Sequence, residues 1–321
     1  MDSLKGIVIV AILMCFISNG AYPQDNKEWE TILAGADLGD NLITSGIVNV
    51  AFEYVRVDSL STRTRELDSE HISKVAADVM TVVRNSENID ISFTFSGERV
   101  RFNERSMNKL PDGRWYTQEW QWAYNGEKLD LLRLDGLGEN DLVKPKASIR
   151  TGYVHRLNRF DPRYNGLKIR GTTVGSFLRG TLGEGVVTQL KIVRKETVDG
   201  VFCTVIKGDI NSSGNIITVW LAPEMLYRPK RIKFDYGNET IMINTTFKEY
   251  LGDVWFPETV VKEKFYLDRS TGKEMLYYRE TITVTKGSVL NTDIPVEKFE
   301  NAFPSGLSVY DYRLGEYLVI E

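Results

Sequence analysis

The sequence predicts a mainly β protein, in which one large antiparallel sheet curves into an incomplete β-barrel covered by a few helices. From Ile89 onward, stretches that alternate apolar and polar residues follow one another almost without interruption. This alternation is the period of half-buried strands. The connections between the stretches are short and rich in Gly, Asn and Asp. Short connections join antiparallel neighbours, because parallel strands need a long crossover.

The chain opens with a segment that is typical of an export signal. Residues 6–17 form one apolar run, shorter than the ~20 residues that span a bilayer. Small residues follow at Ser18 and Gly20, which fits cleavage after Gly20 or Ala21. We therefore expect residues 1–20 to be a signal peptide, residues 21–321 to form a single domain, and the protein to be periplasmic or secreted. An uncleaved anchor and a buried core helix are the alternatives for the apolar run.

Three helices are expected, and the first strand follows the first of them. Apolar residues recur at helical spacing over about 26–44 and 69–84, and Thr173 and Gly180 are suited to begin and end a short helix over 173–179. Between the first two helices, Val48, Val50, Phe52 and Tyr54 alternate with other residues as in a half-buried strand.

Two runs of strands make up the rest of the expected sheet. The first contains strands near 89–95, 100–102, 115–124 and 129–134, the last two joined by the hairpin signal Asn125-Gly126. The second contains strands near 186–194, 201–206, 216–221, 231–236, 240–247, 255–267 and 274–285. Three helices are too few, and lie too early in the chain, to alternate with these strands, so we expect them to cover one face of a curved sheet.

A segment at about 135–185 interrupts the strand pattern. It is glycine-rich and partly helical, with the polar stretch 161–167 near its middle. A long insertion of this kind in a sheet protein is commonly a lid or a binding loop. The alternative is a surface excursion that plugs one end of the sheet.

Composition and motifs argue against several functions. The net charge is −4, from 40 basic and 44 acidic residues, so nucleic acid is not an expected partner. His71 and His155 are the only histidines, and no pair of residues has metal-ligand spacing. No nucleophile or phosphate-loop motif is present. We expect no catalytic residue, no metal, no cofactor and no enzyme activity, and we expect Cys203 to be a buried thiol in an apolar strand.

The expected ligand site is the apolar concave face of the sheet. Its aromatic residues fall on the inward-facing positions of the early strands: Phe52, Tyr54, Phe93, Phe95, Trp120 and Trp122. A curved sheet with helices across its mouth leaves an apolar cavity that suits a hydrophobic ligand. The alternatives are a fully packed core without a cavity and a carbohydrate site, in which the same Trp residues form a sugar platform beside two carboxylates.

The order of elements resembles that of a known family. The strand at 47–57, the hairpin at 93–102, the segment Trp120–Lys128 and the tail Phe303–Arg313 are similar to parts of the LolA/LppX-like periplasmic lipoprotein carriers and their exported relatives. The resemblance implies an incomplete antiparallel barrel whose concave side holds acyl chains. No short motif of the family is diagnostic, so the resemblance covers the architecture of the mature chain and assigns no residue.

The expected function follows from this resemblance together with the apolar face. We expect an exported carrier that binds a lipid or a lipoprotein acyl chain, with membrane-associated proteins as possible further partners. One alternative is an envelope interaction or stress-sensor protein whose groove is filled by its own side chains. The other is a carbohydrate-active protein. Folds of this kind host several functions, so the choice depends on the site.

Overall fold

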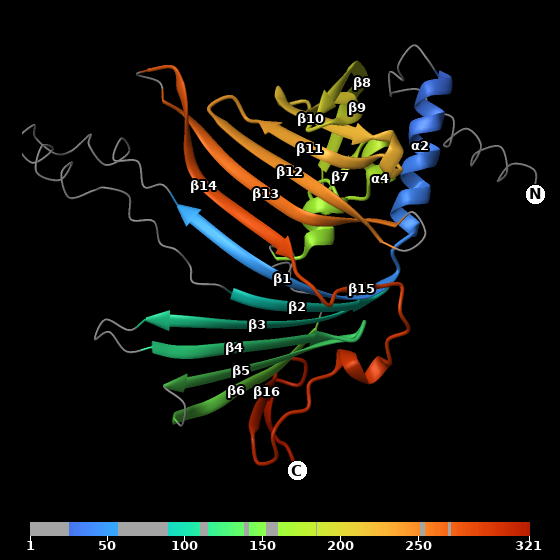
Figure 1. Cartoon of the computed structure of the whole chain (residues 1–321). Helices are drawn as coiled ribbons and strands as arrows, with labels where there is room; N and C mark the ends of the chain where they lie inside the picture. Colours follow the sequence, from blue (N-terminus) through green and yellow to red (C-terminus); the bar gives the residue numbers. More distant parts are fainter. Residues whose placement is uncertain are drawn as a thin grey trace, which may run out of the picture.

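The computed structural model describes residues 26–56, 89–109, 115–137, 141–151, 160–183, 185–250, 254–268 and 271–321. These residues form one large curved sheet that stays open, with few helices, as the sequence predicts (Figure 1). Two of the expected elements, the signal peptide at 1–20 and the helix at 69–84, lie outside the described residues. In the described part of the chain, no helix combines the length and the apolar character needed to cross a membrane.

The strands fall into two meanders and a C-terminal group. The first meander contains β1 (Ser45–Arg56), β2 (Ile89–Ser96), β3 (Arg99–Lys109), β4 (Trp115–Tyr124), β5 (Lys128–Leu137) and β6 (Asp141–Thr151). The second contains β7 (Thr181–Leu182), β8 (Gly185–Val198), β9 (Val201–Ile210), β10 (Asn215–Ala222), β11 (Arg228–Asp235), β12 (Glu239–Tyr250), β13 (Val254–Asp268) and β14 (Lys273–Val284). The C-terminal group contains β15 (Val289–Leu290), β16 (Ser308–Asp311) and β17 (Glu316–Val319).

Strand β1 joins the two meanders into one sheet. One of its edges pairs with β2 and the other with β14, so that Val50 lies between Ile91 and Val284. The order across the sheet is therefore β6-β5-β4-β3-β2-β1-β14-β13-β12-β11-β10-β9-β8, with antiparallel pairing throughout. Strand β16 adds to β6 in parallel. A strand with Val48, Val50 and Phe52 on its inward positions suits this central place.

The insertion expected over 135–185 is shorter than the sequence predicts. Residues 141–151 form strand β6, which pairs with β5. This strand was missed because Pro145 lies inside it and glycines precede it. The register between β5 and β6 shifts between Arg133 and Asp135, and Pro145 lies opposite this irregularity. A proline has no backbone N–H, and at this position no pairing residue on β5 requires one. The described part of the insertion is residues 160–183.

The concave face of the sheet is covered by the insertion and by helix α2 (Asn26–Asn41). The insertion contains the π-helical turn η3 (Arg163–Leu167), which packs against β11, β12 and β13, and the short helix α4 (Val174–Leu178), which packs against α2. Figure 1 shows this segment inside the curve of β8–β14, with α2 upright at the edge. Leu167, Phe177 and Ile32 are buried in the same core as the strand residues beneath them.

The C-terminal segment covers part of the convex face. Phe299, from the turn η5 (Val296–Phe299), and Val309 of β16 are fully buried. Strand β5 is therefore buried on both faces, Leu131 on one and Leu132 on the other. The Asn301 side chain fastens the segment, because its Nδ2 donates to the backbone oxygens of Gln121 (3.1 Å) and Asp130 (3.0 Å).

Candidate functional site

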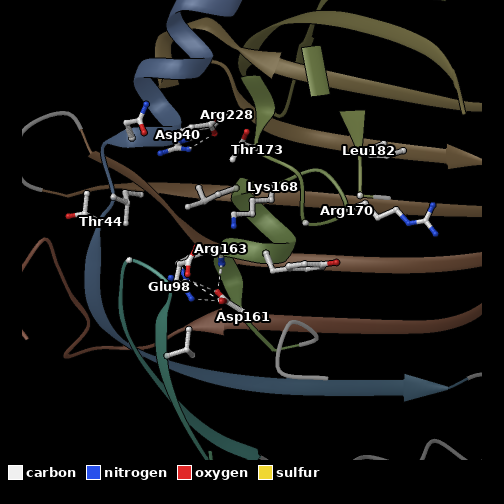
Figure 2. Close-up of a pocket in the computed structure, with 18 of the residues that line it drawn as sticks. Asp40, Thr44, Glu98, Asp161, Arg163, Lys168, Arg170, Thr173, Leu182 and Arg228 are labelled. Carbon is white, nitrogen blue, oxygen red and sulfur yellow. Dashed lines mark hydrogen bonds and ion pairs between the residues drawn. The ribbon is translucent and has the colours of Figure 1, made fainter. Parts of the chain in front are cut away.

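A cleft of about 1270 Å³ opens at one end of the concave face (Figure 2). Its walls are the end of α2, the β2–β3 turn, the insertion and the start of β8 and β11. The residues that line it are Asp40, Asn41, Ile43, Thr44, Gly97, Glu98, Val100, Tyr124, Asp161, Arg163, Tyr164, Leu167, Lys168, Arg170, Gly171, Thr173, Leu182, Gly183, Gly185, Ile210, Asn211 and Arg228. Its volume exceeds the ~300–1000 Å³ of an ordinary small-molecule pocket.

A buried ion pair holds one wall of the cleft. Asp40, near the end of α2, accepts from the backbone N–H groups of Gly175 (2.9 Å) and Val174 (3.4 Å), at the start of α4. Its carboxylate lies 3.8 Å from the guanidinium of Arg228, which also donates to the Gly39 oxygen. Burial raises the pKa of Asp40 and lowers the pKa of Arg228 to about 10, and the attraction between the two opposes both effects. This pair fastens α2 to the insertion.

A second ion pair lies at the opposite end of the cleft. Asp161 accepts from the backbone N–H of Arg163 (2.8 Å) and from its guanidinium (2.6 Å). The guanidinium carbon lies 3.7 Å from the centre of the Phe95 ring, a close cation–π contact. Figure 2 shows this pair beside the exposed Glu98. Arg163 is therefore held by a carboxylate and an aromatic ring, and its charge is already balanced.

Two further cations of the cleft have no such partner. Lys168 and Arg170 have no carboxylate within salt-bridge distance among the described residues. Arg170 has φ 51° and the next residue, Gly171, has φ 82°. The bridge between Ile169 and Thr172 closes this tight turn, whose two positive φ angles are those of a type I′ turn. An arginine in the left-handed region is strained, and the turn presents it at the surface of the cleft.

The deeper wall of the cleft is apolar. Leu167, Leu182 and Ile210 line it and belong to the hydrophobic core, as does Val100 from β3. Tyr124, also on this wall, is partly buried and donates its hydroxyl to the Gly126 oxygen (2.7 Å). The cleft therefore combines an apolar wall with an uncompensated positive charge. Such a lining can hold an apolar chain and an anionic group of one molecule at the same time.

The six aromatic residues expected at the ligand site lie on one face of the first meander. The register pairs Phe93 with Phe102 and Phe102 with Trp122, so the rings form a row across β2, β3 and β4. Phe52, Phe93, Phe95 and Trp122 are buried in the core, and Tyr54 and Trp120 pack at its margin. None of the six lines the cleft.

The insertion supplies the group that covers this aromatic row. The ring of Phe160 stacks on Phe102, with centroids 5.7 Å apart, and meets Phe52 edge-to-face at 4.7 Å. The place that the sequence assigns to a hydrophobic ligand is thus occupied here by a side chain of the protein. Contact of the six residues with a ligand stays a prediction.

Sequence reasoning missed the residues of the cleft. Lys168 and Arg170 belong to the segment that was treated as a lid, and neither belongs to a motif. A weak signal was present, since the stretch 163–170 contains three cations and no acidic residue. Its significance depends on the fold, which brings this stretch next to the end of α2 and the β2–β3 turn. In the described residues, no group of three His, Cys, Asp or Glu side chains is placed to hold a metal ion.

Comparison with solved structures finds similar chains among bacterial proteins. A DUF1329 family protein from Desulfovibrio piger is 11% identical, with a TM-score of 0.41, over 84% of this chain and 97% of the other. A LolA superfamily protein from Nitrosomonas europaea is 14% identical, with a TM-score of 0.37, over 85% of this chain and 97% of the other. A porin-like protein from Bacteroides uniformis is 8% identical, with a TM-score of 0.28, over 75% and 97%.

The fold family that the sequence resembles is thus among these structural neighbours. No protein-family model matches the chain, and no curated protein matches it either. At these identities and TM-scores the comparison describes fold alone. The function has to be argued from the cleft and its side chains.

Proposed function

We propose that this protein binds an anionic amphiphile, a lipid or acyl chain with a negatively charged group, and carries it without chemical change. The observation that carries the proposal is the cleft itself, which joins an apolar wall to two cations that lack a carboxylate partner among the described residues. Lys168 and Arg170 would hold the anionic group, while the chain lies against Leu167, Leu182 and Ile210. Burial of such a chain contributes roughly 0.8 kcal/mol per methylene group.

The ion pairs of the cleft support binding rather than catalysis. Asp40 and Asp161, its two buried carboxylates, are each engaged by an arginine and by backbone N–H groups. A general acid or base needs a carboxyl that is free to exchange a proton with a substrate. The two carboxylates instead hold the walls in place, and Glu98, the third carboxylate of the lining, is exposed at the β2–β3 turn.

The test compares two probes that differ in one charge. A fluorescent long-chain fatty acid and its methyl ester should both bind the apolar wall, and the acid should bind at least tenfold more tightly. The double variant Lys168→Glu with Arg170→Glu should lose that preference for the acid and keep its affinity for the ester. A matched control, Lys286→Glu with Lys298→Glu, changes two exposed lysines outside the cleft and should behave as the wild type.

Two results would contradict the proposal. The first is that neither probe binds the wild-type protein. The second is that the double variant binds the acid and the ester with the same affinities as the wild type does. Native mass spectrometry of gently purified protein gives an independent measurement, because a carrier should show added mass that matches a lipid.

A second candidate function is favoured by Phe160. This side chain fills the concave face against Phe52 and Phe102, as expected for an envelope interaction or sensor protein with a self-filled groove. In that case Phe160→Ala should open a site for an apolar fluorescent probe that is absent in the wild type. A wild-type protein that binds the probe as well as the variant does would speak against this candidate.

We also propose that the protein is exported to the periplasm or secreted, on the strength of the apolar run at residues 6–17. N-terminal sequencing of the exported protein should begin at Ala21 or Tyr22. Recovery of an exported protein that retains Met1 would contradict the cleavage.

A further inference from the structure

The convex face of the second meander carries a group of basic side chains that serve neither the core nor the cleft. This basic face consists of Lys191, Arg194, Lys207, Arg231 and Lys233, from strands β8, β9 and β11. Four of them, all except Lys191, line a shallow depression of about 480 Å³ together with Val193, Thr218, Trp220 and Met242. The whole chain has a net charge of −4, so this concentration of positive charge is local.

The register places three of these lysines in one row across the sheet. Lys191 pairs directly with Lys207. Thr218 of β10 lies between Lys207 and Lys233, since it pairs with both. Like charges directly opposite each other destabilise a sheet, and neighbouring strands are only ~4.8 Å apart. Folding alone therefore does not account for the row.

The carboxylates near the basic face balance only part of its charge. Glu196 binds Arg194 (2.5 Å) and accepts a hydrogen bond from the indole of Trp220. Asp235 lies 3.8 Å from Lys233.

The other cations have no carboxylate at ion-pair distance in the described part of the chain. Lys191 and Lys207 are exposed, and Asp209 lies two positions after Lys207 on β9. Arg231 donates to the Asn244 side chain (2.6 Å) and lies 5.7 Å from the Trp220 ring. The face thus keeps a net positive charge, with its arginines held in place and Lys191 and Lys207 exposed to solvent.

We propose that the basic face docks the protein onto an anionic phospholipid bilayer. Its cations lie in two rows over strands β8–β11, so they meet several headgroup phosphates at once. A bilayer presents negative charge over a plane, and the attraction of each Lys or Arg to it adds to the others. The proposal does not rest on the cleft, because the cleft opens on the concave side of the sheet.

Vesicle co-sedimentation tests the proposal. The full chain should bind vesicles that contain phosphatidylglycerol, should not bind pure phosphatidylcholine vesicles, and should be released at high salt because surface charges are then screened. The triple variant Lys191→Glu, Lys207→Glu and Lys233→Glu should weaken binding by at least about a hundredfold. The control triple Lys27→Glu, Lys286→Glu and Lys298→Glu alters exposed lysines elsewhere and should keep most of the affinity.

Three results would overturn the proposal: no binding to anionic vesicles, equal binding to neutral ones, or wild-type binding by the triple variant. Binding to soluble heparin without binding to vesicles would also overturn it, in favour of a soluble polyanion. Circular dichroism verifies that each variant is folded. The two proposals fail separately, since the Lys168→Glu, Arg170→Glu variant should still bind vesicles and the basic-face variant should still bind the fatty acid.

Discussion

The two meanders of the sheet share a topology but bury their faces in different ways. The concave face of the first is aromatic, with Phe93, Phe102 and Trp122 in one row. The matching face of the second mixes aliphatic residues such as Ile217 and Val219 with single rings such as Phe234, the cross-strand partner of Ile217.

The convex faces differ as well. On the first meander the C-terminal segment covers β4–β6, and Phe299 and Val309 are buried there. On the second a small cluster around Cys203 and Trp220 is buried, and the basic face adjoins it. The difference teaches that the first meander is covered by other segments on both faces, while the convex face of the second meander stays partly accessible to solvent.

The largest expected effect comes from the aromatic row. Phe102→Ala should lower the free energy of unfolding by about 3–5 kcal/mol, because it removes a fully buried ring that packs against Phe93 and stacks on Phe160. The matched variant in the second meander, Ile217→Ala, leaves a smaller cavity and should cost about 2–4 kcal/mol. Urea unfolding measures both. A larger loss for Ile217→Ala would reverse the comparison.

The convex cover of the first meander can be loosened at one residue. Asn301→Ala removes two hydrogen bonds to buried backbone oxygens and should cost about 2 kcal/mol. Amide exchange should quicken in β4 and β5 and stay unchanged in β10 and β11. Asn238→Ala, at an exposed turn of the second meander, serves as the control and should leave stability nearly unchanged. If amide exchange quickened equally in both meanders, the C-terminal segment would not be protecting the first meander alone.

The C-terminal hairpin should make the stability of this cover depend on pH. Hydrogen bonds and charge from Arg313 lower the pKa of Asp311 to about 2. Because the folded pKa lies below the unfolded value, the contribution is present above about pH 4 and is lost as the pH falls toward 2. Arg313→Gln should flatten this part of the curve of unfolding free energy against pH. An unchanged curve would exclude this pair as the cause.

The smallest effect on stability, and the clearest on reactivity, concerns the second meander. Burial raises the pKa of the Cys203 thiol from its ordinary value of about 9 to about 11, so the folded protein holds about a hundredfold less thiolate at pH 8. Labelling with a maleimide should be slow in the folded protein and fast in urea. Rapid labelling without unfolding would mean that the convex cluster opens readily.

The sequence by itself determined the local structure of this protein. Alternating residues such as Val48, Val50 and Phe52 specify a strand and its inward face, and Thr173 caps α4 as expected, with its hydroxyl accepting from Ser176 N (3.3 Å). These features depend on residues near each other in the chain, so one sequence is enough to predict them. Strand β6 was the exception, because a proline such as Pro145 is typical of a turn. It fits this strand only because the register between β5 and β6 shifts opposite it.

Only the tertiary structure decided what covers each face. Pairing of β1 with β14 joins residues more than two hundred positions apart, and no local sequence pattern predicts which strand pairs with β1. The same holds for Phe160 over the aromatic row and for Lys168 and Arg170 beside the apolar wall. Alternation shows that a face is apolar, but a lid, a ligand and a C-terminal segment all satisfy an apolar face equally well. The cleft and the basic face are therefore products of long-range packing, which places Lys168 and Arg170 beside an apolar wall and brings cations of separate strands together on the convex face.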